Sequence, residues 1–113
     1  MVSIKAAREL ALVFDEVTEA PHFEIFAFKV NKKIFASLDE TNKRVMVKLS
    51  EIDQDVYCSI DKDIIYPVPG GWGKQGATYI ELTKVKKDLL KDALTTAYCN
   101  IAPKKLADKY RIG

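Results

Sequence analysis

The stretch YPVPGGWGKQG, residues 66–76, has the least ordinary composition in the chain. It holds four of the five glycines, two of the four prolines and the only tryptophan. Glycine permits positive φ angles and close approach of the backbone. An exposed indole beside an ammonium, here Trp72 and Lys74, could stack on a nucleic-acid base and pair with a phosphate. Alternatively, Trp72 could anchor a protein partner or form a buried lid over the edge of a sheet.

This stretch does not match a nucleotide-binding loop, because Gln75 stands where a Walker motif requires Ser or Thr. His22 is the single histidine and has no evident partners for a hydrolytic triad or an imidazole zinc site. Cys58 and Cys99 lack zinc-ligand spacing. The sequence therefore predicts no catalytic site, no metal site and no cofactor, and we expect a protein that is not an enzyme.

Lysines within strand-like segments offer a second kind of chemistry. In RVMVKL, alternation places Lys48 on the face opposite Val47, and in FEIFAFKV it places Lys29 opposite Phe28. The same face is expected to carry Met46, Tyr79 and Glu81. Such a face could bind phosphates or stack bases. Lysines are also usual on any solvated sheet face, so alternation alone does not distinguish the two interpretations.

The charge is unevenly distributed, although the net charge is only +2. Residues 1–82 carry 10 basic and 13 acidic side chains, whereas residues 83–113 carry 8 basic and 3 acidic ones, including Lys104 and Lys105. The local net charges are thus −3 and +5. A basic C-terminal quarter indicates a polyanionic partner.

Length and composition predict one globular domain over residues 1–113. No apolar run approaches the ~20 residues that span a bilayer, and MVSIKAAREL has no signal-peptide core. We therefore expect a cytoplasmic protein without a membrane partner, whose cysteines remain thiols. Its oligomeric state is not indicated.

Periodicity predicts the elements that must position these residues. Serine caps begin helices over residues 3–15 and 50–58, and a wide apolar stripe predicts a helix over 86–100. A further short helix, PKKLADKY, is expected with Pro103 in its first turn. The expected strands are 23–30, 34–38, 44–49, 64–66 and 78–82. Short connections make the first three an antiparallel meander. The fold class is α+β: an antiparallel sheet with N- and C-terminal helices packed on one face.

Four segments carry a family resemblance: EAPHFEIFAFKVNKKIFASL, VMVKLS, YPVPGGWGKQGATYIEL and APKKL. With them the chain resembles the MmcQ/YjbR family of small bacterial proteins, from about residue 11 to residue 107. A mild departure is Asn31-Lys32-Lys33, where the family often has glycine. The resemblance implies a CyaY-like fold, a bacterial cytoplasmic setting, no established enzyme activity and a double-wing motif described as DNA-binding. By their positions in these motifs, the basic residues that the resemblance singles out are Lys29, Lys48, Lys74, Lys104 and Lys105.

Three functional hypotheses follow. The leading one is binding of DNA or RNA through charge and stacking, with Lys29, Lys48, Trp72, Lys74, Lys104 and Lys105 as the candidate residues. The second is a protein-interaction module anchored by Trp72. The third is metal handling by analogy to iron-binding frataxins, on the thin acidic cluster Glu9, Asp15, Glu16 and Glu19.

Overall fold

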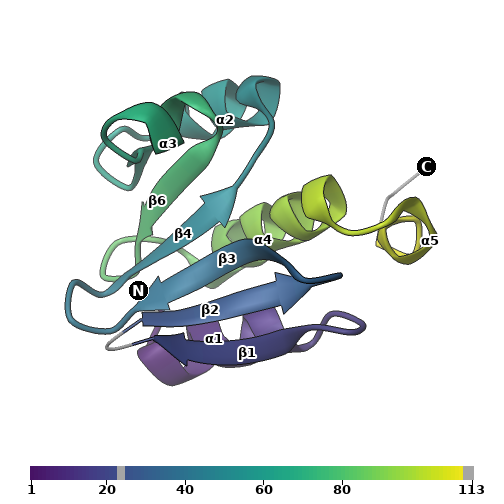
Figure 1. The fold of residues 1–113 in the computed structure, drawn as a ribbon. Helices are drawn as coiled ribbons and strands as arrows, with labels where there is room; N and C mark the ends of the chain where they lie inside the picture. Colours follow the sequence, from purple (N-terminus) through teal and green to yellow (C-terminus); the bar gives the residue numbers. More distant parts are fainter. Residues whose placement is uncertain (23–24, 111–113) are drawn as a thin grey trace.

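A six-stranded antiparallel sheet, covered by helices on one face, forms the fold (Figure 1). The computed structural model describes residues 1–22 and 25–110. The helices are α1 (Ile4–Leu12), α2 (Glu51–Cys58), α3 (Gly71–Lys74), α4 (Lys87–Ile101) and α5 (Lys104–Ala107). The strands are β1 (Thr18–His22), β2 (Ile25–Val30), β3 (Lys33–Asp39), β4 (Arg44–Lys48), β5 (Ile65–Pro67) and β6 (Ala77–Glu81). The α+β prediction is confirmed.

Serine caps begin two of the helices, as predicted. The Ser3 hydroxyl accepts from the Ala6 amide at 3.1 Å, and the Ser50 hydroxyl accepts from the Asp53 amide at 3.1 Å. Each bond satisfies one of the amides that the first turn of a helix leaves without an intrahelical partner. Pro103 was expected within the first turn of α5, but it is the residue immediately before that helix.

The sheet has the order β1-β2-β3-β4-β6-β5. The expected meander is present as β2, β3 and β4, and Asn31 and Lys32 form the first turn with φ angles of 51° and 66°. Two consecutive positive φ angles are typical of a tight hairpin turn, which here forms without glycine. The sequence missed β1, because Pro21 and the charged residue Glu19 weaken the strand pattern. Pro21 is tolerated because β1 is an edge strand.

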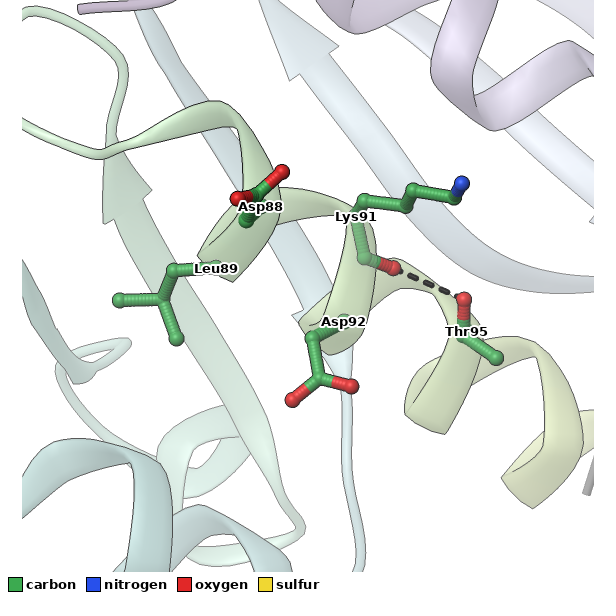
Figure 2. Close-up of a pocket in the computed structure, with 5 residues that line it drawn as sticks. All are labelled: Asp88, Leu89, Lys91, Asp92 and Thr95. Carbon is green, nitrogen blue, oxygen red and sulfur yellow. Dashed lines mark hydrogen bonds between the residues drawn. The ribbon is translucent and has the colours of Figure 1, made fainter. Parts of the chain in front are cut away.

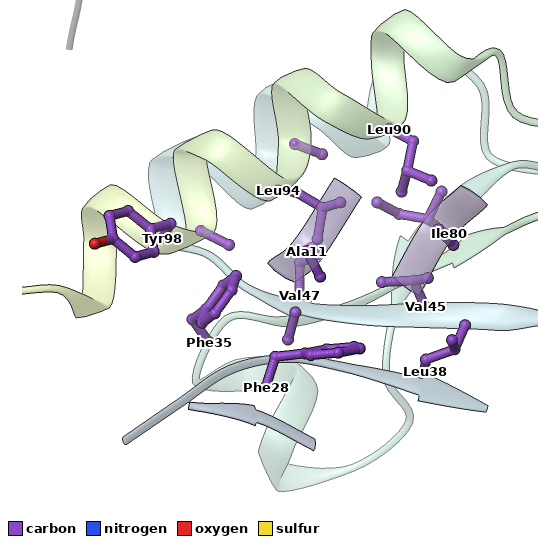
Figure 3. Packing of buried hydrophobic residues seen from close by; sticks show 14 of the residues in the cluster. Ala11, Phe28, Phe35, Leu38, Val45, Val47, Ile80, Leu90, Leu94 and Tyr98 are labelled. Atoms are coloured by element: carbon purple, nitrogen blue, oxygen red, sulfur yellow. The ribbon is translucent and has the colours of Figure 1, made fainter. Parts of the chain in front are cut away.

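The main core lies between the sheet and the helices, and the alternation in the strands correctly predicted its residues (Figure 3). Phe28, Val47 and Ile80 point into it from three strands, and Leu90 and Leu94 meet them from α4. Neither cysteine forms a disulfide, as expected. In the described part of the chain, none of the helices has the length and apolar character needed to cross a bilayer.

Tyr98 closes the core where α1, α4 and α5 meet. Its ring stacks on Phe14 with centroids 4.7 Å apart, and its hydroxyl donates to the Asp15 carbonyl at 2.7 Å. Burial, assisted by Tyr110 and Asp15, raises the pKa of Tyr98 to about 12. The phenol therefore stays protonated in the folded protein at a pH where an unfolded chain already ionises.

Tyr98→Phe is expected to lower the free energy of unfolding by about 1 kcal/mol at pH 7, because the Asp15 carbonyl loses its donor. Between pH 10 and pH 12 the unfolded wild type releases the phenolic proton and the folded one keeps it. Wild-type stability should therefore fall there by about 1.4 kcal/mol per pH unit from this group alone. Urea unfolding at pH 7 and pH 11 should show the two proteins converging, and a constant gap would contradict the assignment.

Candidate nucleic-acid interface

Lys29 and Lys48 lie at the same end of the open sheet face, on the side away from α4. Phe28 and Val47 both pair with Ala36, from opposite sides, so the lysine that follows each of them lies one residue further in the same direction. One strand separates them, which corresponds to about 10 Å between their backbones. Both side chains are half-buried. Their aliphatic stems can therefore lie along the sheet with the ammonium groups in solvent.

The glycine-rich stretch forms the short helix α3, although the sequence indicated only a loop. The stretch ends at Gly76, beside Lys48, because Lys48 pairs with Ala77, the first residue of β6. Lys48, Trp72, Gln75 and Ala77 line one small depression of about 80 Å³. The cation and the indole therefore belong to one continuous surface.

Trp72 is 68% exposed, so it is not a buried lid over the sheet edge. The backbone next to Trp72 is held by hydrogen bonds from α2. The Gln54 side chain donates to the Gly73 carbonyl at 2.8 Å and to the Ala77 carbonyl at 3.1 Å, which ties α3 to α2. The backbone around the indole is thus fixed while the ring itself faces solvent.

The other predicted lysines are not part of this depression. Lys74 follows Trp72 by two residues, and side chains two apart on a helix do not face each other. Lys104 and Lys105 are exposed on α5. That helix follows the C-terminal end of α4 in the helical layer (Figure 1). The Asn100 side chain at this end of α4 donates to the Lys48 carbonyl at 3.1 Å, so Lys104 and Lys105 differ from Lys48 in the layer that carries them and not in the end of the sheet that they lie near.

Two cations at the same end of the sheet were missed as site residues. Lys32 lies in the β2–β3 turn and Lys33 begins β3, and both are exposed. The motif Asn31-Lys32-Lys33 was interpreted only as a turn. Antiparallel pairing alone would have placed this turn beside the end of the strand that carries Lys29. Lys33 pairs with the core residue Val30 and therefore projects toward the helical side of the sheet. Lys29, Lys32 and Lys48, together with Trp72, are named the lysine end of the sheet below.

Tyr79 lies on the open face as expected, but its ring is already covered. The Arg44 guanidinium lies over it at 3.8 Å from the centroid, and Tyr66 makes an edge contact at 5.9 Å. The Tyr66 hydroxyl donates to Glu81. Burial and this carboxylate raise the pKa of Tyr66. Of the aromatic rings considered for base stacking, Trp72 therefore remains the exposed one. Arg44 was missed, although alternation with Lys48 would have placed it here.

Met46 was expected on the solvated face and is instead buried. It packs with Val68 and Ala77 in a small second apolar cluster, against which Ile34 and Tyr79 also pack. The chain after β5 folds back onto the sheet here, with the Val68 amide donating to the Ala77 carbonyl at 3.0 Å. The centre of the open face is thus apolar and buried, and its charged groups lie toward the strand ends.

A broader depression of about 580 Å³ lies along α4 and is lined by Asp88, Leu89, Lys91, Asp92 and Thr95 (Figure 2). Thr95 donates to the backbone carbonyl of Lys91, and Asp92 accepts a hydrogen bond from the Tyr57 hydroxyl of α2. Thr95 is therefore bonded within α4, and Asp92 links α4 to α2. The lining has no exposed ring that could stack on a base.

The carboxylates considered for metal binding are not gathered into a site. Glu19 forms an ion pair with Arg8, and Asp15 forms one with Lys109. These partners lower the pKa of both carboxyl groups. Within residues 1–22 and 25–110 no three His, Cys, Asp or Glu side chains converge on one point. The side chain of His22 lies outside the described part of the structure.

Comparisons with known proteins agree with this architecture. A model of the YjbR family matches residues 12–100. The crystal structure of Deinococcus radiodurans protein DR2400, which has a DUF419 domain, superposes with a TM-score of 0.79. The two chains are 19% identical, and the match covers 97% of this chain and 88% of that one. At this identity the match shows a shared fold alone. No curated protein matches the chain.

Proposed function

Because this chain belongs to the YjbR family and Lys48 and Trp72 line one depression on its open sheet face, we propose that it binds nucleic acid through the lysine end of the sheet. The shared depression is the observation that carries the proposal. An ammonium pairs with a phosphate, and an exposed indole offers a face on which a base can stack. Binding is expected to depend on charge and stacking and to show little sequence preference.

Single strands fit this surface better than duplexes. A base must leave the helical stack before it can lie on Trp72, and unpaired strands offer such bases at low cost. Lys29 on the open face and Lys32 at the hairpin would then pair with neighbouring phosphates of the strand. The surface is small, so micromolar affinity at low salt is the reasonable expectation.

The sole tryptophan supplies a direct assay. Titration with oligo-dT, oligo-U and a DNA duplex should quench the Trp72 emission, most strongly with the single strands. The logarithm of the binding constant should fall linearly with the logarithm of salt concentration, with a slope of about −2 if three phosphates are neutralised. No binding of any probe at the lowest salt would refute the proposal.

A matched pair of variants tests the location. Lys29→Glu with Lys48→Glu is expected to weaken binding at least about 10-fold at 50 mM salt, because two attractions become repulsions at the site. Lys104→Glu with Lys105→Glu makes the same change of net charge on α5, which packs on the main core in the helical layer, and should change affinity by less than about 3-fold because neither side chain lies on the open face. Equal losses would mean that net charge, and not the lysine end of the sheet, determines binding.

The exposure of Trp72 also fits a second function, an anchor for a protein partner. Trp72→Ala separates the two proposals. If the folded variant binds oligo-dT as well as the wild type and loses a protein in pull-down experiments, the indole serves the protein partner. If binding of oligo-dT falls several-fold, the indole serves the nucleic acid.

A further inference from the structure

Helix α2 presents an unpartnered apolar stripe that the proposed function does not use. Ile52, Val56 and Ile60 follow one another at intervals of four residues, and their side chains are 76%, 56% and 54% exposed. Residues four apart share one face of a helix, and Ile60 continues the row just beyond the C-terminus of α2. The opposite face packs inward through Gln54 and Tyr57. The stripe is therefore not part of either apolar cluster.

Carboxylates surround this stripe. Residues 51–63 carry five acidic side chains and one basic one, a local net charge of −4 in a chain whose total is +2. Asp53 and Asp55 lie on either side of the row formed by Ile52 and Val56, given the 100° that each helical residue turns. Asp61 and Asp63 extend the acidic border beyond Ile60. An apolar row between acidic borders complements an apolar row between basic ones.

We infer that the α2 stripe docks a cationic amphipathic helix of another protein. The three aliphatic side chains would meet apolar residues spaced at three and four along the partner, and the carboxylates would meet its flanking Lys or Arg side chains. The inference does not depend on nucleic-acid binding, because α2 carries none of the residues of the lysine end of the sheet.

The charges argue against two other occupants. Pairing α2 with α2 of a second copy would place two segments of −4 against each other, and like charges across an interface are strongly unfavourable. Packing the stripe on a different surface of a second copy would be a head-to-tail contact, which gives a ring at particular rotations and otherwise open-ended assembly. An anionic lipid surface would repel the same carboxylates. A basic partner helix would be attracted by the carboxylates and would bind without self-assembly.

The test uses the full chain labelled with ¹⁵N and a synthetic helical peptide with leucines at i, i+4 and i+8 between lysines. We expect amide shifts confined to residues 50–62, and no shifts with a peptide in which glutamates replace the lysines. Ile52→Gln with Val56→Gln should weaken peptide binding at least 10-fold, because glutamine preserves the helix and removes the apolar contact. Leu12→Gln with Val13→Gln, which changes exposed apolar residues at the end of α1, should leave binding unchanged.

Each other outcome would overturn the inference. Shifts scattered over the surface, or equal binding by the α2 variant, would mean that the peptide is attracted by charge alone. Equal binding of both peptides would remove the stated partner chemistry. Sedimentation equilibrium showing a dimer that dissociates in the Ile52→Gln, Val56→Gln variant would make the stripe a self-association surface. Binding of wild type to phosphatidylserine vesicles through the stripe would make it a membrane contact.

Discussion

Gly76→Ala is expected to lower the free energy of unfolding by about 3 kcal/mol. Gly76 has a φ of +104°, which strains any residue with a β-carbon. A β-carbon at this position would also lie 1.8 Å from the carbonyl oxygen of the buried residue Leu49. That neighbour is backbone and cannot rotate aside, so the strand end carrying Lys48 would have to move. Urea unfolding followed by circular dichroism measures the loss.

Gly71→Ala is the matched control from the same stretch. A β-carbon there meets nothing within 4 Å, and Gly71 does not have a positive φ. Its free energy of unfolding should change by less than about 0.5 kcal/mol. Similar losses in both variants would show that the stretch responds to any loss of glycine, and not to the close approach of Gly76 to Leu49.

Gln54→Glu is expected to destabilise the protein by about 3 kcal/mol at pH 7, although the two side chains have nearly the same shape. The buried amide nitrogen of Gln54 donates to the carbonyls of Gly73 and Ala77 and to the Thr78 hydroxyl, at 2.8, 3.1 and 3.2 Å. A carboxylate in its place donates nothing and faces oxygen atoms, so buried acceptors lose their partner and a charge is buried without a counterion.

The pH dependence of this variant follows from the same geometry. Burial among oxygens raises the pKa of the introduced carboxyl above that of the unfolded chain, because the protonated form can still donate one hydrogen bond. The folded variant then holds a proton that the unfolded chain has released, so stability is lost as pH rises from about 4. The difference from the wild type should therefore shrink at pH 4. Gln75→Glu, at an exposed glutamine of the same stretch, should show no such dependence.

Gln54→Glu also connects stability with the proposed site. Because Gln54 holds the backbone on either side of the α3 helix end, the variant should broaden or shift the Trp72 emission at pH 7 before global unfolding. Nucleic-acid affinity should fall with it, since Trp72 would no longer be held beside Lys48. Unchanged emission with unchanged affinity would mean that the position of the indole does not depend on Gln54.

Local patterns were sufficient for most of the fold. The Ser3 and Ser50 caps, the apolar stripe of α4 and the strict alternation through Val45 and Val47 each depend on neighbours within a few residues. One buried face fixes the register of a strand, because a shift by one residue would turn every apolar side chain outward. The same alternation correctly placed Lys29 and Lys48 on the open face. The family resemblance supported the hypothesis of nucleic-acid binding, which periodicity does not carry.

What the sequence left open was decided by contacts between distant segments. Whether Trp72 is a lid or an exposed ring depends on how Gly73 and Gly76 press against Val68 and Leu49, and no local pattern encodes that approach. The burial of Met46, the Arg44 guanidinium over the ring of Tyr79 and the placement of Lys104 in the helical layer likewise arise when segments far apart in the chain pack together. Residue types thus determined which chemistry was available, and tertiary packing decided which groups share a surface, because only the folded chain sets distances between segments.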